Sequence, residues 1–384
     1  MTHQPHPSTT RGVVELLAEH GFEGMAQAME LLLDECMKIE RQEFLGVGPY
    51  QRGENRNGRA NGFKPKRVRT RVGELNLAVP QVRDARFYPS ALEKGVRSER
   101  ALNLAMAEMY VQGVSTGKVT KIVEELCGCE VSSSEVSRVA AALDEELETW
   151  RNRPLGEIKY LIVDARYEKI REGGCVIDCA VLVAVGVDPT GHRSVLGVSV
   201  SLSEAEVHWR EFFKSLLARG MHGVELITSD AHAGMAEARK ACLPGVPWQR
   251  CQFHLQKNAL DHAPTETLKQ EVTEDLRGVF NAADAERAEQ ELRRVVAKHE
   301  QDAPKLAAWI DTNAREGLTV FRLPATHRKR LRTTNLLERL NRELKRRTRV
   351  ATLFPNEASL LRLVTAVLME QSEQWETGKR YVTF

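Results

Sequence analysis

Three acidic residues have surroundings suited to metal-assisted phosphoryl chemistry: Asp164, Asp230 and Glu338. Asp164 and Asp230 each end a short apolar run of the kind that forms a buried strand, and Glu338 lies in a run crowded with Arg and Lys. If the two strands are neighbours in one sheet, their carboxylates come side by side. Hard oxygen ligands suit Mg²⁺, and a pair of such ions can activate an attacking oxygen and stabilise a leaving oxygen.

Each of these acids also has an ordinary structural interpretation. An acid at the end of a strand is most often a turn residue or a helix cap. An acid in a charge-rich helix is most often a salt-bridge partner. Glu343 competes with Glu338 but lies five residues further on, where a helix turns it about 140° away, so the two cannot serve one site. The residues alone leave these interpretations open.

The helix that carries Glu338 is predicted over residues 332–345. Thr334 or Asn335 is its predicted N-cap, and its apolar seam consists of Leu337, Leu340 and Leu344. Lys345 lies two turns after Glu338 on about the same side, where it would give a phosphate its counter-charge.

The elements around the two aspartates follow a mixed α/β pattern. Three successive antiparallel strands, at 160–165, 176–187 and 194–201, are followed by a helix at 207–219 and a second acid-ending strand at 223–230. A helix at 235–241, a short strand at 247–251 and a long helical stretch at 257–313 complete the segment.

Two basic stretches, 52–86 and 322–349, stand out in a chain whose net charge is only +2. They suggest a polyanionic partner, most simply nucleic acid. The alternative is that both basic stretches form surface faces that only contact solvent. Residues 46–65 read as a flexible or DNA-ordered arm, and 68–82 as a β-hairpin. On that hairpin three arginines share one face, at a pitch that can follow a phosphate backbone: Arg67, Arg69 and Arg71.

A helix-turn-helix pattern follows, with helices at 115–126 and 132–150. Ser132 or Ser133 would cap the second helix, which places Ser134 and Arg138 near the end that meets base edges in DNA-binding proteins. Helix pairs of this length also occur in many proteins that do not bind DNA.

Composition favours a cytoplasmic protein. The seven cysteines are odd in number and lack paired C-x-x-C spacing, which favours reduced thiols. Cys251 and His254 have half of the spacing of a zinc site, but no other ligands are indicated. Residues 1–10 lack the apolar core of a signal peptide, and no run of eighteen apolar residues is present.

The order of these motifs resembles a DDE transposase with a ribonuclease-H-like core. More narrowly, the chain is similar to the Mutator-type transposases of bacterial insertion sequences, the insertion-sequence 256 group. The resemblance runs from about Arg56 to Trp375, and four stretches carry it: 161–171, 229–234, 249–254 and 332–341.

The resemblance implies that Asp164, Asp230 and Glu338 form a catalytic triad that binds Mg²⁺, with Mn²⁺ as an alternative. It implies a ribonuclease-H-like mixed-sheet core with an all-helical insertion, preceded by a mainly helical DNA-binding region with a β-hairpin. The expected organisation is a helical segment (1–50), a basic arm and hairpin (51–95), a helix-turn-helix region (96–152) and a catalytic domain (153–384) with the insertion at about 256–328.

The implied activity is DNA cleavage at the ends of an insertion sequence, followed by transfer of the freed 3′-hydroxyl to target DNA. The hairpin arginines, Ser134 and Arg138 would bind the terminal inverted repeats. Lys345, Arg346 and Arg332, beside the triad, would contact DNA, with Lys345 positioning a phosphate, while Cys251 and His254 form a structural motif. Action on two ends implies a homo-oligomer on DNA, in the cytoplasm with the nucleoid and not at a membrane. Two other classes remain: a metal-dependent nuclease on the same core, and a DNA-binding regulator without catalysis.

Overall fold

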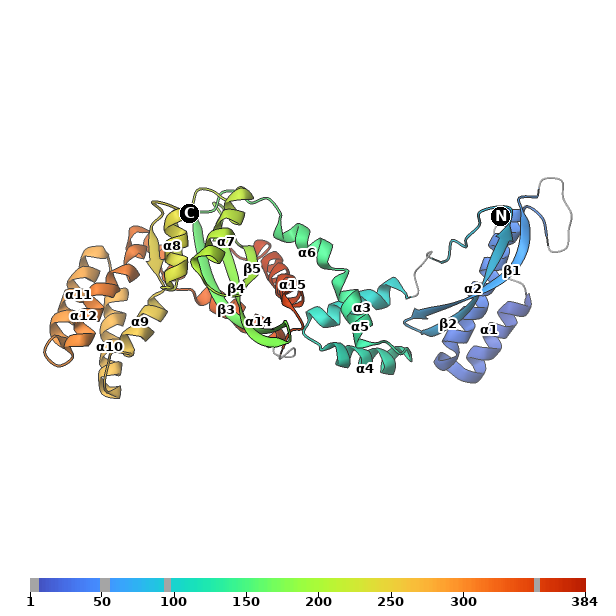
Figure 1. Ribbon diagram of the computed structural model, residues 1–384, viewed down its shortest axis with the longest axis horizontal. Coiled ribbons are helices and arrows are strands. Elements are labelled where there is room, and N and C mark those ends of the chain that lie inside the picture. The colour runs from blue at the N-terminus through green and yellow to red at the C-terminus, as the bar shows by residue number, and fades with distance from the viewer. Residues whose placement is uncertain (1–6, 49–55, 93–97, 349–352) are drawn as a thin grey trace. The chain divides into compact units, whose positions relative to one another are not determined.

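The computed structural model describes residues 7–48, 56–92, 98–348 and 353–384 (Figure 1). The chain divides into two compact units, Met1–Ala142 and Leu143–Phe384. No helix among the described residues is long and apolar enough to cross a membrane.

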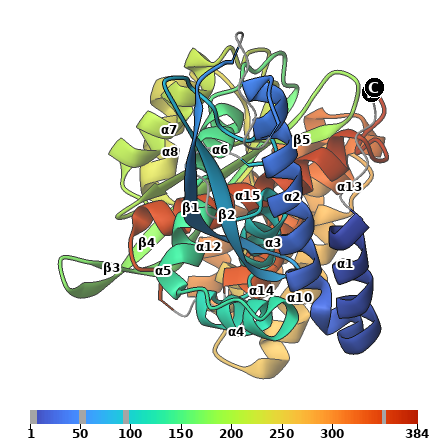
Figure 2. The ribbon, with the colours of Figure 1, turned by 90° about the vertical axis from the view of Figure 1, so that its right-hand side faces the viewer.

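The N-terminal unit combines helices with one two-stranded sheet. Its elements are α1 (Pro7–His20), the 3₁₀ turn η1 (Gly21–Gly24), α2 (Met25–Leu45), β1 (Arg59–Thr70), β2 (Gly73–Arg83), α3 (Arg100–Val111), α4 (Thr116–Cys127) and α5 (Ser133–Ala141). Figure 2 shows α2 running along the β1–β2 hairpin. Met37 of α2 packs on alternate residues of β2, Leu75, Leu77 and Val79, so one face of the hairpin is buried.

The hairpin is longer than its sequence predicted. The turn was expected around Gly73 and Glu74 but lies at Arg71 and Val72, so Arg71 is outside the strand. β1 starts at Arg59, paired with Arg83, so the predicted arm over 46–65 is wrong from residue 59 onwards. Residues 49–55 of that arm lie outside the described residues. An antiparallel ladder is built from backbone hydrogen bonds, so the polar first half of β1 pairs without giving an apolar signal.

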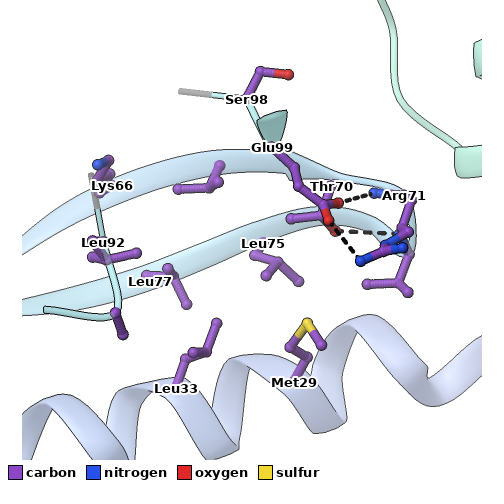
Figure 3. A pocket seen from close by; sticks show the side chains of 13 residues that line it. Met29, Leu33, Lys66, Thr70, Arg71, Leu75, Leu77, Leu92, Ser98 and Glu99 are labelled. Atoms are coloured by element: carbon purple, nitrogen blue, oxygen red, sulfur yellow. Dashed lines mark hydrogen bonds and ion pairs between the residues drawn. The ribbon is translucent and has the colours of Figure 1, made fainter. Parts of the chain in front are cut away.

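A cavity of about 310 Å³ lies between α2 and the hairpin (Figure 3). Its apolar lining includes Met29, Leu33, Leu75, Leu77 and Leu92. At one end Arg71 donates its backbone N–H to Glu99 (2.9 Å), and its guanidinium lies 3.1 Å from the same carboxylate. This ion pair engages one of the three arginines that the sequence placed in a row.

The helix-turn-helix pattern is present, with a shorter second helix. Gly128 ends α4 in a left-handed conformation (φ +60°), and the Ser132 side chain caps α5 by accepting from Glu135 N–H, as predicted. The prediction of one helix over 132–150 is wrong, because α5 ends at Ala141 and α6 (Asp144–Arg151) begins anew. Three acidic residues fill the first turn of α6, where the helix dipole favours negative charge.

The second unit contains a five-stranded mixed sheet in the order β5-β4-β3-β6-β7. The predicted antiparallel trio is confirmed as β3 (Tyr160–Glu172), β4 (Cys175–Val187) and β5 (Arg193–Ser201). β6 (Leu226–Ser229) and β7 (Trp248–Arg250) continue the sheet parallel to β3.

Helices cover both faces of this sheet (Figure 1). Apolar side chains of β3 and β4 on one face pack against α7 (Glu206–Ala218) and α8 (Ala233–Cys242), with Trp209 and Phe213 fully enclosed. α14 (Asn335–Thr348) and α15 (Glu357–Glu376) contact β3 from the other face. Successive β3 side chains alternate between these layers, so even-numbered Asp164 lies on the α14 side, opposite Leu161 and Val163.

The residues between β7 and α14 form a helical subregion with a core of its own. Its elements are α9 (Gln252–Leu260), α10 (Glu266–Phe280), α11 (Ala285–His299), α12 (Pro304–Asn313), the 3₁₀ turns η2 (Ala314–Gly317) and η3 (Thr319–Arg322), and α13 (Ala325–Leu331). Leu255, Val272, Leu276, Leu292 and Ile310 pack together at its centre. This insertion therefore separates Asp230 from Glu338 along the chain without disturbing the sheet.

Candidate active site

Parallel pairing of β3 and β6 brings the two aspartates to the same level of the sheet. Tyr160 pairs with Leu226 and Ile162 with Thr228, and the same register carried forward sets Asp164 beside Asp230. Asp230 directly follows β6, as predicted. Asp164 does not end its strand, because β3 continues to Glu172 through its pairing with the long strand β4.

Asp164 is held by one amide and is poorly solvated. Asn341 of α14 donates from Nδ2 to Oδ2 of Asp164, 2.8 Å away. The pKa of Asp164 is raised to about 6, chiefly by burial and in part by the negative charges of Asp230 and Glu204, while the Ala165 N–H and the charge of His254 oppose the rise. The site therefore gathers negative charge around a partly buried carboxylate.

Glu338 projects from the first turn of α14. The predicted seam is confirmed, since Leu337, Leu340 and Leu344 are all buried. Glu338 N–H donates to Thr334 O at 3.0 Å, which fixes the start of the helix. Its Oε1 is buried and has no hydrogen-bond partner, an arrangement that disfavours a carboxylate unless a cation approaches.

His254 lies between the second aspartate and the glutamate. Its Nδ1 is 3.7 Å from Oδ2 of Asp230, and its Nε2 is 3.8 Å from Oε1 of Glu338. A hydrogen bond with Cys251 raises the pKa of His254 to about 9 against the opposing effect of burial, and the charges of Cys251, Asp230 and Asp164 add to the rise. The imidazole is therefore positively charged at neutral pH and offsets repulsion between the carboxylates.

Cys251 connects this histidine to the start of the glutamate helix. The thiol is fully buried and accepts from both the backbone N–H and the hydroxyl of Thr334, each at 3.3 Å. Burial favours a higher pKa for Cys251, but hydrogen bonds with His254 and Thr334 outweigh it and lower the pKa. The C-x-x-H motif thus joins the starts of α9 and α14.

The described residues do not form a ready-made metal centre. In this part of the chain no three His, Cys, Asp or Glu side chains are arranged to hold a metal ion. The oxygen donors gathered by β3, β6 and α14 are nevertheless of the type that Mg²⁺ prefers.

The predicted DNA contacts beside the triad have different surroundings. Lys345 is exposed on α14. The Arg346 guanidinium lies 2.7 Å from Glu343, and this hydrogen bond, with help from Arg347, lowers the pKa of Glu343 to about 2. The Arg332 guanidinium donates to Asn281 (2.8 Å) and to the backbone of Phe280, so it ties the link between α13 and α14 to the end of α10.

In the N-terminal unit each arginine of the predicted row has a carboxylate neighbour. Arg67 lies 3.6 Å from Glu74, and Arg69 donates to both oxygens of Glu135 at 2.7 Å. Arg138 lies 3.5 Å from the same Glu135, and Ser134 is exposed in the first turn of α5. Arg69 thereby attaches the hairpin to the second helix of the helix-turn-helix.

Comparison with known proteins decides the family. The model described as "Transposase, Mutator family" matches residues 11–378, nearly the whole chain. The chain belongs to the Mutator family of transposases.

Relatives in this family align over almost their full length. The transposase for insertion sequence element IS406 of Burkholderia multivorans is 56% identical over 370 residues, covering 96% of this chain and 95% of the relative. The transposase for IS256 in transposon Tn4001 of Staphylococcus aureus is 37% identical, covering 92% and 91%. A structure of the simian T-cell lymphotropic virus intasome with a PP2A regulatory subunit covers 53% of this chain and 64% of that chain, at 14% identity and a TM-score of 0.17, a likeness too weak to support an argument.

Two residues near the carboxylates of this Mutator-family chain were missed by reasoning from its sequence. Asn341 could have been found, because it lies one turn after Glu338 on the same helix, at the end of the 332–341 stretch. Glu204, in the loop between β5 and α7, is mostly buried and adds negative charge near Asp164. No spacing in the sequence links a loop acid to a residue two strands away, so only the fold reveals it.

Proposed function

We propose that this transposase cuts and joins DNA with Asp164, Asp230 and Glu338 as its catalytic carboxylates, on a ribonuclease-H-like core. The observation that carries the proposal is the convergence of these acids from three separate segments. The β3–β6 register aligns the two aspartates, and His254 lies within 4 Å of both Asp230 and Glu338.

The strand order supports the proposed core. Three antiparallel strands are followed by two that run parallel to the first, and the last helices return to the face that carries Asp164. The helical insertion lies between the second aspartate and the glutamate, as the family resemblance implies.

The oxygen donors of Asp164, Asp230 and Glu338 are of the type that binds a divalent cation, and these side chains would move together to hold one. Glu338 Oε1 is buried without a hydrogen-bond partner, and Asp164 is poorly solvated among negative charges, so a cation would relieve both. When bound, two Mg²⁺ or Mn²⁺ ions would activate the attacking oxygen and stabilise the leaving oxygen of a phosphodiester.

The chain's own groups orient this site. Asn341 fixes one oxygen of Asp164 by its amide hydrogen bond, and Cys251 holds Thr334 and so the first turn of α14. His254 carries the positive charge that keeps Asp230 and Glu338 close before a metal ion arrives. Exposed Lys345 would neutralise phosphate nearby.

Binding of the terminal inverted repeats belongs to the same proposal. The helix-turn-helix presents Ser134 and Arg138 on its second helix, as expected of a reader of base edges. Arg67, Arg69 and Arg71 would contact phosphates only by exchanging their present carboxylate neighbours for DNA. Action on two ends implies at least two copies on DNA.

A strand-transfer assay tests the function. A labelled element end is incubated with supercoiled target DNA and Mg²⁺, and 3′-end cleavage and joined product are both measured. Wild type should yield both, and Glu338→Gln should bind the end but lose about 10²-fold or more of each product. Glu343→Gln is the matched control, since it makes the same change on the same helix away from the site.

Three results would contradict the proposal. Equal joined product from wild type and Glu338→Gln would remove the catalytic assignment. Cleavage without any joining would indicate a nuclease. Full biological activity after alanine substitution of all three acids would indicate a regulator.

A further inference from the structure

Three arginines gather around one tyrosine in the second unit. We call Arg193, Arg330 and Arg339 the arginine cluster. The guanidinium carbons of Arg193 and Arg330 lie 4.9 Å and 5.5 Å from the centre of the Tyr381 ring, and the Tyr381 hydroxyl donates to Arg330 O at 2.8 Å. Arg339, from the next helix, is close enough for its charge to act on both Arg193 and Tyr381.

The tyrosine is fixed in place by the turn between β4 and β5. Backbone N–H groups of Tyr381 and Val382 donate to Gly191 O at 2.7 Å and 3.3 Å. Gly191 has φ +87°, and a Cβ there would collide with Val382 O, so only glycine permits this approach. The cluster is therefore built by β5, α13, α14 and the segment after α15, and not by one mobile side chain.

The positive charge of the cluster is not neutralised within the described part of the chain. None of its three arginines forms an ion pair with a described carboxylate, whereas Arg347 on the same helix as Arg339 binds Glu343 and Glu370. Burial, together with repulsion from Arg330 and Arg339, lowers the pKa of Arg193.

Arg193 also has an unused donor. Its Nε is buried and has no hydrogen-bond partner, although its guanidinium stacks over both Trp375 (4.7 Å) and Tyr381. A planar guanidinium held against aromatic rings is pre-organised for an anion with two acceptor oxygens.

We propose that the arginine cluster binds a backbone phosphate of the DNA whose end occupies the candidate active site. Arg339 directly follows Glu338 in α14, and Arg193 lies level with Tyr160, four residues before Asp164 on β3, because both pair with Val187. The cluster therefore lies on the same helix and the same sheet as the candidate carboxylates. A phosphodiester supplies the missing negative charge, and its paired oxygens match the guanidinium fork. This inference rests on the proposed function, which makes DNA the substrate.

Salt dependence of DNA binding tests the inference. The affinity for a labelled duplex from the element end is measured against salt concentration for Arg330→Gln, Arg339→Gln and the double variant, with Mg²⁺ absent. Each lost phosphate contact should reduce the slope of log affinity against log salt by about 0.9. At fixed salt each single variant should bind about tenfold more weakly, as expected for a hydrogen bond to a charged group.

Matched variants separate phosphate binding from packing. Arg294→Gln removes one exposed charge from the insertion, where Glu291 lies 3.6 Å away, and should leave the slope unchanged. Arg339→Lys keeps the charge and should retain most of the slope. Tyr381→Leu removes the ring but none of the arginines, and should leave the slope close to that of wild type.

The outcomes distinguish the inference from the proposed function. If wild type does not bind the duplex, the proposed function fails. If wild type binds and the glutamine variants, folded as judged by circular dichroism, keep the wild-type slope, only the cluster is refuted. A loss of slope in Tyr381→Leu as large as in the double variant would assign the arginines to packing of the segment after α15.

Discussion

Replacing Asp164 by Asn should stabilise the metal-free protein while abolishing its chemistry. The pKa of Asp164 is raised from its ordinary value of 3.8 to about 6, chiefly by burial. At about 1.4 kcal/mol per pH unit, this corresponds to about 3 kcal/mol of destabilisation by the ionised carboxylate at neutral pH, as an upper bound. Asn keeps the shape and can still accept from Asn341, so we expect a gain of about 2 kcal/mol, or about 4–8 °C in melting temperature.

The pH dependence has a definite sign. An acid whose pKa is higher in the folded state destabilises the fold once pH exceeds its ordinary value, and the full effect is reached above its folded value. The advantage of Asp164→Asn should therefore be largest at pH 7–8, shrink between about pH 6 and 4, and vanish below. Urea unfolding measures the difference in unfolding free energy between the variant and wild type, once in EDTA and once in excess Mg²⁺.

Glu343→Gln is a control whose effect on stability should have the opposite sign. Hydrogen bonds from Arg346 and Arg347 lower the pKa of Glu343 to about 2, so this substitution should weaken the fold slightly at neutral pH. Adding Mg²⁺ should reduce the difference in unfolding free energy between Asp164→Asn and wild type, but should not change the difference between Glu343→Gln and wild type. An Asp164→Asn protein that is less stable than wild type at pH 7.5, or whose advantage is the same at pH 4, would refute the reasoning.

Three further substitutions have defined outcomes. Asn341→Ala removes a hydrogen bond to a charged group, so single-turnover strand transfer should slow about tenfold to hundredfold, and an unchanged rate would show that this amide does not position the β3 carboxylate. Cys251→Ala leaves both donors of Thr334 without their acceptor and should cost about 1–3 kcal/mol of unfolding free energy in urea, whereas Cys251→Ser should cost less; equal losses would exclude the hydrogen bonds as the cause. Arg69→Gln breaks the bidentate pair between β1 and α5 and should increase amide hydrogen exchange in both elements, whereas Arg67→Gln, whose pair is longer and exposed, should not; similar exchange in the two would exclude a joining role.

The sequence predicts those parts of the fold where one periodicity persists. The antiparallel strands at 176–187 and 194–201, the α14 seam and the Ser132 cap are confirmed, because alternation, helical spacing and capping residues are local signals. The extension of β1 to Arg59 and of β3 to Glu172 was not predictable in this way. Most of those residues are polar, and backbone hydrogen bonds to the neighbouring strand of the hairpin hold them without an apolar pattern.

The candidate site likewise contains residues that the sequence predicts and residues that only the fold reveals. Residue type and order select the three acids, and the parallel β3–β6 pairing explains how two of them align. The position of His254 between Asp230 and Glu338 has no counterpart in spacing, because it depends on how α9 packs beside α14. Likewise Arg346 and Arg332 look like free cations in the sequence, whereas in the fold one binds Glu343 and the other the insertion.

Whether the three carboxylates act as one site is measured most directly by single-turnover strand transfer in Mg²⁺. Asp164→Asn, Asp230→Asn, Glu338→Gln and the triple variant are compared on one labelled DNA end. Groups that work as a unit are non-additive, so each single variant should fall to the same residual rate as the triple variant. A single variant that keeps the wild-type rate, or losses that multiply from single to triple, would contradict a shared catalytic centre.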